Sequence, residues 1–359
     1  MPSCGSWKKD LKKGMGVDYA DFFRGKDILV TGGLGFIGSN LCIKLVELGA
    51  NVTIVDNMLP RQGGNLFNIE PVKDRVKVNF SDVRNRLSMN YLVKGRDIIF
   101  HLAGQVNHVD SMRNPVQDLE INCHGTLVLM EALRHNNRDA IVVYSGTRGE
   151  YGSSVKLPVD EDHPTNPKGI YAVTNLAAEK MILVYNHVYN IPAVCLRITN
   201  TYGPRHQMMH DEYGVFNWFI RKAMDNDTIP VFGDGMIRRD FLYVEDLVEC
   251  LLMTVMSKNT AGEVFNVGTG IPVTFRELAE KIVEVTGSGT YRFTDFTKER
   301  AEVEPGDYYA DITKIKKLVG WSPSTSMEVG IKKTVEFYRQ YKKYYWAHDP
   351  GTGHEDSVL

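Results

Sequence analysis

The sequence predicts an α/β protein built on a doubly wound parallel sheet. A glycine-rich turn joins an apolar strand to a helix, and short β-branched runs alternate with amphipathic stretches over most of the chain. Such alternation implies parallel strands joined by right-handed crossovers, with helices on both faces of the sheet. A smaller α/β domain, expected to bind substrate, begins where the alternation weakens near Arg197.

Periodicity defines the expected elements in chain order. Seven strands are expected at 27–31, 51–55, 76–79, 97–101, 140–145, 193–198 and 263–267. Helices are expected between them at 37–48, 86–93, 116–136 and 171–189, and in the smaller domain at 212–226, 245–257 and 274–286. The expected organisation is an N-terminal extension (1–25), a dinucleotide-binding domain (26–196 plus 240–269), a substrate domain (197–239 plus 270–346) and a C-terminal tail (347–359).

The composition excludes several classes of protein. The chain has 359 residues, of which 43% are hydrophobic and 24% charged, and its net charge is −2. These values are typical of a soluble globular protein and give no field that would attract nucleic acid or an anionic membrane. No apolar run approaches the ~20 residues that span a bilayer. The five cysteines show no metal-ligand spacing. We therefore expect a cytoplasmic protein without a metal site.

The turn after the first strand has the pattern of a dinucleotide site. Gly32, Gly35 and Gly38 separate Ile28-Leu29-Val30 from an amphipathic run. Glycines at this spacing let the backbone approach a pyrophosphate, and the following helix presents its N-terminus to that anion. Asp56 ends the next strand. An acidic residue there can bind the adenosine ribose and repel a 2′-phosphate, which favours NAD over NADP.

Polar or small residues end the following strands as well. They are Asp82-Val83, Leu102-Ala103-Gly104 and Thr147. Because parallel strands end at one edge of the sheet, these residues together outline a groove. Tyr171 begins a later helix and could face that groove as a general base beside the Thr147 hydroxyl. A phenol normally titrates near pH ~10, so it would need a nearby cation to act near neutrality.

This order of motifs resembles the NAD-dependent epimerase/dehydratase family of extended short-chain dehydrogenases/reductases, which act on nucleotide-activated sugars. The resemblance covers residues 26 to about 340 and implies a Rossmann fold. Its further anchors are Asn122, Tyr151-Gly152, Arg197, Asn200, Tyr202-Gly203-Pro204 and Arg239-Asp240-Phe241.

The resemblance implies a role for each matching residue. Thr147 would hydrogen-bond the sugar hydroxyl, Tyr171 would take its proton, and Asn175 would complete the catalytic set. NAD would be held by Gly32, Gly35, Phe36, Ile37, Gly38, Asp56, Asn57, Asp82, Val83, Leu102, Ala103, Gly104, Asn122, Tyr171 and Asn175. The nucleotide-diphosphate sugar would be held by Thr147, Arg148, Asn200, Arg205, Arg239 and Arg300. Helices 116–136 and 171–189 would form a homodimer through a four-helix bundle.

The chain departs from the family pattern at the position of Asn175. Relatives carry a lysine there, four residues after the tyrosine, which binds the nicotinamide ribose and lowers the tyrosine pKa through its charge. Asparagine can keep a hydrogen bond but brings no charge. Lys168 precedes the helix and could replace the missing cation, whereas Lys180 is out of phase. Asn175→Lys is therefore expected to raise turnover.

Two further departures concern the substrate. Relatives that eliminate water carry an Asp-Glu pair after the threonine, and decarboxylating relatives carry a Ser-Glu pair, where this chain has Arg148-Gly149. Relatives usually place an arginine just before a Gly-Asp pair to grip phosphate. Here that residue is Glu304, and Arg300 is the nearest arginine.

These features favour a nucleotide-sugar epimerase, most simply one that inverts C4 of a UDP-sugar through a transient keto-sugar. The alternatives are a CDP-sugar C2 epimerase, a 4,6-dehydratase, and an NAD- and nucleotide-sugar-binding protein weakened by Asn175. The first alternative rests on a resemblance to tyvelose-type enzymes in His101–Val106, Ser111, Asn114-Pro115 and Glu120-Ile121-Asn122.

Overall fold

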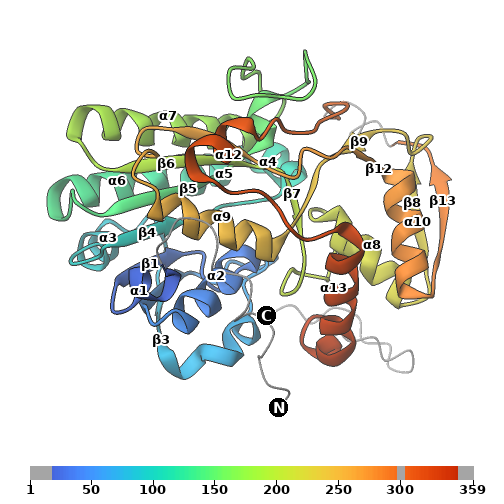
Figure 1. The fold of residues 1–359 in the computed structure, drawn as a ribbon, viewed down its shortest axis with the longest axis horizontal. Coiled ribbons are helices and arrows are strands. Elements are labelled where there is room, and N and C mark those ends of the chain that lie inside the picture. Colours follow the sequence, from blue (N-terminus) through green and yellow to red (C-terminus); the bar gives the residue numbers. More distant parts are fainter. Residues whose placement is uncertain (1–17, 297–303, 347–359) are drawn as a thin grey trace.

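The computed structural model describes residues 18–296 and 304–346. A seven-stranded parallel sheet forms its larger part, with strands in the order β11-β6-β5-β4-β1-β2-β3 (Figure 1). The bounds are β11 (Val264–Val267), β6 (Ala193–Ile198), β5 (Ile141–Thr147), β4 (Ile98–His101), β1 (Asp27–Thr31), β2 (Asn51–Asp56) and β3 (Val76–Phe80). The predicted doubly wound sheet is therefore confirmed.

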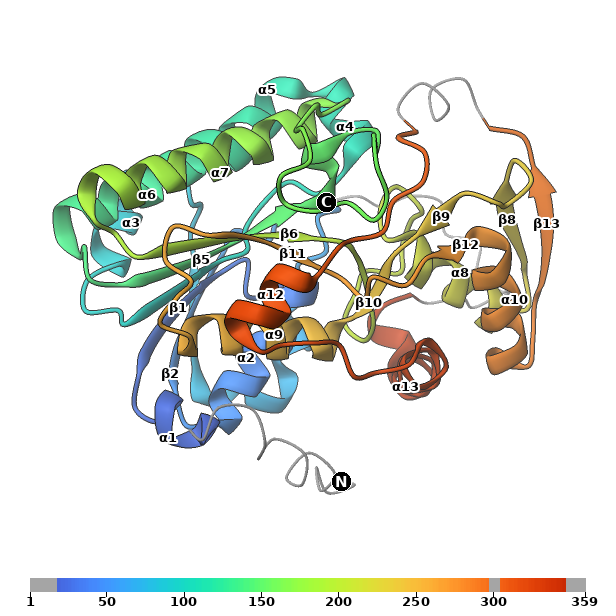
Figure 2. The same cartoon turned by 45° about the horizontal axis from the view of Figure 1, so that its top comes forward.

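Helices cover both faces of the sheet. One face packs against α1 (Tyr19–Phe23), α2 (Phe36–Glu47), α9 (Val244–Met256) and α12 (Thr313–Val319), together with the 3₁₀ segment η1 (Leu66–Arg75). The other packs against α3 (Arg86–Leu92), α6 (Gly125–Asn136) and α7 (Ile170–Tyr189), as Figure 2 shows. No helix in the described part of the chain is long and apolar enough to cross a membrane.

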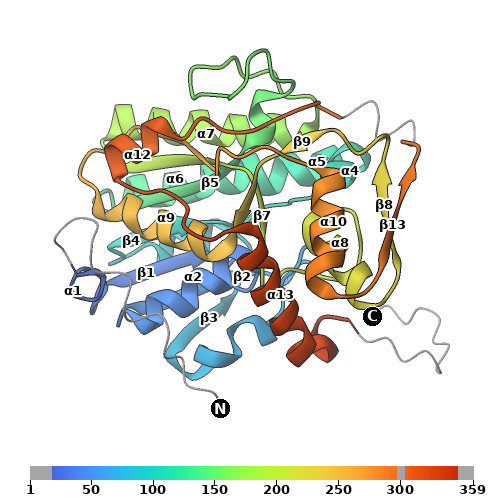
Figure 3. The same ribbon diagram turned by 45° about the vertical axis from the view of Figure 1, so that its right-hand side comes forward.

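The smaller lobe lies beside the carboxyl ends of the sheet strands (Figure 3). Its helices are α8 (Val215–Met224), α10 (Phe275–Thr286) and α13 (Met327–Tyr341), followed by the 3₁₀ turn η4 (Lys342–Tyr344). Its short strands pair as β10 (Phe241–Tyr243) with β7 (Asn200–Tyr202), β12 (Val273–Thr274) with β9 (Arg238–Arg239), and β13 (Thr290–Thr294) with β8 (Thr228–Phe232). Aromatic side chains such as Phe216, Phe219 and Tyr338 fill a core of its own.

The structure corrects one predicted helix. The range 116–136 is not a single α-helix but three segments, namely α5 (Pro115–Asp118), the π-helical η2 (Leu119–His124) and α6. The π-helical turn contains Asn122, whose side chain exchanges two hydrogen bonds with the backbone of Gln105. A preceding short helix, α4 (His108–Arg113), was not predicted.

The strand order places a crevice at the centre of the sheet. The chain passes from β1 outward to β2 and β3 on one side, and then to β4 and beyond on the other side. Loops that leave β1 and β4 therefore diverge onto opposite faces, and the space between them is where open α/β sheets bind ligands. The predicted domain boundaries remain predictions, and the ranges 1–17 and 347–359 lie outside the described residues.

Candidate active site

The glycine turn between β1 and α2 leaves no room for side chains. Gly32 has a φ of +71°, and a Cβ there would lie 2.8 Å from the backbone nitrogen of Ala103. A Cβ on Gly38 would lie 2.2 Å from the Gly32 carbonyl oxygen. The turn therefore brings backbone N–H groups and the start of α2, at Phe36 and Ile37, to the edge of a cavity. Such an edge suits a pyrophosphate.

Asp56 lies at the end of β2 with its carboxylate fixed by the backbone. The N–H groups of Leu34 and Met58 donate to its two oxygens, at 3.0 and 2.9 Å. Burial raises the pKa of Asp56 above its ordinary value, although these two hydrogen bonds oppose that effect. The carboxylate thus borders the cavity in a fixed orientation that can accept ribose hydroxyls.

The next strand end carries Asp82 and Val83. The side chain of Asn57 donates to Asp82 at 2.7 Å, and the Arg84 guanidinium binds both oxygens of Asp82. Burial alone would raise the pKa of Asp82, but the contacts from Arg84 and Asn57 together outweigh it and lower the pKa to about 2. Asn57 and Val83 line the cavity, whereas the Asp82 side chain is engaged by its neighbours.

The first cavity has a volume of about 510 Å³, within the range of cofactor sites. Leu102, Ala103 and Gly104 form one wall of it, after β4. A Cβ on Gly104 would lie 3.0 Å from the Asn122 side-chain oxygen, so a larger residue would disturb Asn122. The first cavity therefore brings together all the predicted cofactor residues except Asp82, whose neighbour Val83 lines it.

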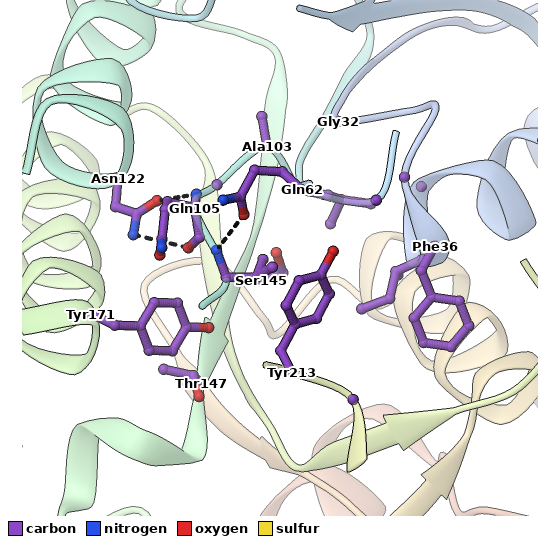
Figure 4. A pocket seen from close by; sticks show the side chains of 18 of the residues that line it. Gly32, Phe36, Gln62, Ala103, Gln105, Asn122, Ser145, Thr147, Tyr171 and Tyr213 are labelled. Carbon is purple, nitrogen blue, oxygen red and sulfur yellow. Dashed lines mark hydrogen bonds between the residues drawn. The ribbon is translucent and has the colours of Figure 1, made fainter. Parts of the chain in front are cut away.

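Thr147 and Tyr171 meet at the floor of this cavity (Figure 4). Thr147 ends β5, and Tyr171 lies in the first turn of α7, where its backbone N–H donates to the Ser111 hydroxyl at 3.1 Å. The His108 ring packs edge-on against Tyr171, with 4.5 Å between ring centroids. Burial raises the pKa of Tyr171 to about 12, while a hydrogen bond with Thr147 and the charge of Arg148 oppose the rise.

Asn175 lines the same cavity, one helical turn after Tyr171. Its Nδ2 donates to the Tyr171 carbonyl at 2.7 Å, and its Oδ1 accepts from the Tyr144 hydroxyl at 3.0 Å. The amide is therefore held by protein groups on both sides. Lys168 lies at the exposed rim of a second cavity, and Lys180 pairs with Glu179 at 2.9 Å.

A buried ion triad lies behind this floor. Arg197 on β6 contacts Glu150 at 3.1 Å and Glu179 at 2.8 Å. Burial raises the pKa of Glu150 well above its ordinary value, and the charge of Glu179 adds to the effect. Glu150 also accepts from the Thr147 N–H at 3.0 Å in the 3₁₀ turn η3 (Arg148–Tyr151). The triad therefore fixes the position of Thr147.

The second cavity, of about 280 Å³, adjoins the first and shares Thr147, Arg148 and Asn200 with it. The Arg148 Nε donates to the Asn200 side-chain oxygen at 2.9 Å. Arg239 lines only the second cavity, where its guanidinium pairs with Glu304 and donates to the Gly306 carbonyl at 2.5 Å. Glu304, which stands where the family pattern predicts an arginine, therefore pairs with Arg239 and offsets its charge.

One predicted substrate residue, Arg205, does not line either cavity. Arg205 binds the side chain of Asn40 and the carbonyl of Asn68, and its guanidinium lies 5.0 Å from the centre of the Phe337 ring. These contacts hold its guanidinium away from both cavities. Arg300 lies outside the described residues.

The residues that line the first cavity but were not predicted to do so include Gln62, His108 and Tyr213. Gln62 precedes a Gly63-Gly64 pair, which was a usable signal for a close backbone approach. Tyr213 comes from the smaller lobe and points into the cavity opposite Tyr171 (Figure 4). The described residues include no group of three or more His, Cys, Asp or Glu side chains that could hold a metal ion.

Comparison with known proteins identifies this arrangement. A sequence model described as GDP-mannose 4,6 dehydratase matches residues 29–334. The chain belongs to the NAD-dependent epimerase/dehydratase family. It is similar to a putative UDP-glucose 4-epimerase of Methanocaldococcus jannaschii, with 37% identity over 87% of this chain and 98% of the relative. It is also similar to the dTDP-D-glucose 4,6-dehydratase of Mus musculus, with 34% identity over 88% of this chain and 89% of the relative.

Solved structures of the family match over nearly their whole length. The UDP-glucose 4-epimerase of Thermotoga maritima with UDP-glucose is 31% identical, with a TM-score of 0.79, over 88% of this chain and 99% of that one. MoeE5 in complex with UDP-glucuronic acid and NAD is 26% identical, with a TM-score of 0.77, over the same shares. NAD is bound in MoeE5 and also in DesIV, a dTDP-glucose 4,6-dehydratase of Streptomyces venezuelae that is 26% identical, with a TM-score of 0.81, over 90% of this chain and 99% of that one.

The residues of this chain fit NAD. Because Gly32 and Gly38 lack a Cβ, the turn can pack against the Leu102–Ala103 backbone and close on itself, which gives the tight glycine turn that a pyrophosphate site needs. The fixed carboxylate of Asp56 can accept hydrogen bonds from the ribose. Leu102, Ala103 and Gly104 are small or apolar and continue the groove toward Tyr171. NAD therefore would lie along the first cavity, between the glycine turn and the Thr147–Tyr171 pair.

Proposed function

We propose that the chain is an NAD-dependent nucleotide-sugar epimerase that inverts C4 of a UDP-sugar through a transient keto-sugar. The observation that carries this proposal is the pairing of Thr147 with Tyr171 at the meeting of the two cavities. Tyr171 would accept the proton of a sugar hydroxyl, and Thr147 would donate a hydrogen bond to the same oxygen. NAD, when bound, supplies a hydride acceptor that later returns the hydride.

The surroundings of Thr147 support epimerisation over elimination. Loss of water needs an acid and a base near the sugar. Glu150, the carboxyl next in the chain, is fully buried against Arg197 and lines neither cavity. Glu304 lines the second cavity and is paired with Arg239. Of the acidic residues that line the first cavity, Asp56 is held by backbone N–H groups, Glu212 is paired with Arg61, and Asp211 precedes Glu212 in the same loop. Epimerisation needs only the oxidation and reduction of one carbon, which Thr147 and Tyr171 can serve.

The other candidate functions rest on specific features. Residues 101–106 with Ser111 and Asn122 support a CDP-sugar C2 epimerase by resemblance. Asn175 supports a binding protein of weak activity, because both polar atoms of its side chain are engaged by the protein. The relatives include both epimerases and dehydratases, so a 4,6-dehydratase also stays a candidate. Localisation in the cytoplasm stays a prediction from composition.

The test uses the NAD-loaded protein with UDP-, GDP-, CDP- and dTDP-linked sugars, and NMR to identify the products. A C4 epimer of a UDP-sugar is expected. Tyr171→Phe should lower turnover by about 10²–10⁴-fold without loss of bound NAD, because the phenol only moves a proton. Retained NAD without turnover on any sugar would favour the binding protein, and loss of water or carbon dioxide would overturn the epimerase.

We further propose that two copies pair through α7 and the neighbouring helices to form a four-helix bundle. Val173, Val184 and Val188 lie on one face of α7, and their side chains are about half exposed. Their spacing of 11 and 4 residues places them along a single helical stripe. An apolar stripe that stays exposed on one copy is typical of an interface.

A further inference from the structure

Arg148 differs from its neighbouring arginines in having no carboxylate partner. Arg197 pairs with Glu150 and Glu179, Arg238 with Asp307, and Arg239 with Glu304. Within residues 18–296 and 304–346, no carboxylate forms an ion pair with Arg148. Its Nε donates to the neutral side chain of Asn200, and its guanidinium lies 5.2 Å from the centre of the Tyr308 ring.

The environment of this guanidinium disfavours its charge. Burial and the charge of Arg239 lower the pKa of Arg148 to about 10. A partly buried cation without a counter-ion loses hydration without compensation, and a bound anion offsets this cost. The two terminal nitrogens have no hydrogen-bond partner among the described residues and border the cavities. Their planar fork matches a carboxylate in two parallel hydrogen bonds.

The place of Arg148 along the cleft indicates which part of a ligand it would meet. It follows Thr147 directly and lines the cavity that also contains Tyr171. Arg239 lines only the second cavity, which Tyr171 does not line, and is the arginine that we assign to a diphosphate. A group bound by Arg148 therefore lies close to the sugar carbon that Thr147 and Tyr171 serve.

We propose that Arg148 binds a carboxylate on the sugar, so that the substrate is a nucleotide-linked uronic acid. This inference rests on the proposed function for the identity of the site, but it concerns binding and does not depend on turnover. An arginine beside the reacting hydroxyl would both select an acidic sugar and orient its ring. It is a specificity residue, whereas Tyr171 and Thr147 serve the chemistry.

The experiment compares UDP-glucuronate with UDP-glucose, which differ only in a carboxylate or a hydroxyl at C6. Binding to the NAD-loaded protein is measured by titration calorimetry, with UDP as a third ligand. The wild-type protein should bind UDP-glucuronate about tenfold or more tightly than UDP-glucose, as expected for a charge-assisted pair. In Arg148→Gln this ratio should fall close to one, and in Arg148→Lys it should be intermediate.

Lys168→Gln is the matched control, because Lys168 is a cation at the exposed rim of the same cavity. Its ratio should stay close to the wild-type value. Equal affinity of the wild-type protein for the two sugars overturns the inference. So does a parallel loss of affinity for UDP-glucuronate, UDP-glucose and UDP in Arg148→Gln, which would assign Arg148 to the diphosphate.

Epimer formation is followed by NMR in the same samples, which separates the two proposals. A preference for UDP-glucuronate that requires Arg148, without any epimer, supports the inference and overturns the proposed function. Epimerisation of UDP-glucose without tighter binding of UDP-glucuronate supports the proposed function and overturns the inference about Arg148. The comparison of ligands on the wild-type protein keeps the inference testable even if a variant of Arg148 fails to fold.

Discussion

At the scale of single residues, the site combines a tyrosine base with an uncharged neighbour one helical turn away. Burial raises the pKa of Tyr171 to about 12, so little phenolate exists near neutrality without help. Asn175 contributes hydrogen bonds, not charge, and Arg148 is the cation that opposes the rise. The position of Asn175 therefore controls how basic the site can be.

Asn175→Lys tests this control directly. A cation one turn after Tyr171 favours its phenolate, so the pH–rate profile should shift to lower pH by about 1–3 pH units, with higher turnover at pH 7. Asn175→Met is the control, because it adds length without charge and should not shift the profile. A profile unmoved by lysine, measured as kcat against pH with the true substrate, would show that charge is not the missing component.

At the scale of elements, the 3₁₀ turn after β5 links the site to a buried ion triad. Glu150 caps this turn at Thr147 and also contacts Arg197. Burial raises the pKa of Glu150, and the charge of Glu179, which also pairs with Lys180, adds to the rise. The position of Thr147 thus depends on a hydrogen bond to Glu150, a carboxyl group whose pKa is raised.

This coupling predicts how stability changes with pH. The unfolded chain releases the Glu150 proton near pH 4.5, and the folded chain releases it at higher pH. The contribution of Glu150 to the free energy of unfolding is therefore complete below pH 4.5 and is lost as the pH rises. Glu150→Gln cannot ionise in either state. Its stability relative to the wild type should rise between pH 5 and pH 8, as measured by urea denaturation.

Glu277→Gln provides a control of opposite sign in a second capping box. Hydrogen bonds from Thr274 lower the pKa of Glu277, so its stabilising effect is present above the ordinary pKa and is lost as the pH falls. The deficit of Glu277→Gln should therefore be largest near pH 7 and shrink toward pH 4. Parallel stability curves for the two variants would contradict the assigned role of Glu150.

At the scale of the whole molecule, the sequence predicts the sheet better than the smaller lobe. Most sheet strands are buried runs rich in β-branched residues and bounded by turns, so local pattern identifies them, and the partly exposed edge strand β3 alternates apolar with polar residues. Strands β9 and β12 contain two residues each, and β13 pairs with β8 from far along the chain. No local signal of length or alternation marks them. Likewise, only the folded chain shows that Glu304 neutralises Arg239 and that Arg205 turns away.

The proposed homodimer is also tested at this scale. Replacing Val184 and Val188 by glutamate on the exposed stripe of α7 should convert a dimer into a monomer, because two like charges per copy would be buried in the interface. Light scattering after size-exclusion chromatography measures the mass. Val155→Glu, at an exposed loop position away from α7, should leave the dimer intact. A monomeric wild-type protein would contradict the proposal.

The ion pair between Arg239 and Glu304 makes Arg239 a weak binder of simple dissolved anions, unlike Arg148 of the same cavity, which has no carboxylate partner among the described residues. An arginine that already holds a carboxylate gains little from chloride or a single phosphate, because one ionic contact is merely exchanged for another. A diphosphate offers more charge and more oxygens, and can displace Glu304 where a simple ion cannot. Glu304 thus competes with dissolved anions for Arg239. Ordinary salts should therefore inhibit this protein less than they inhibit a site in which both arginines lack a carboxylate partner.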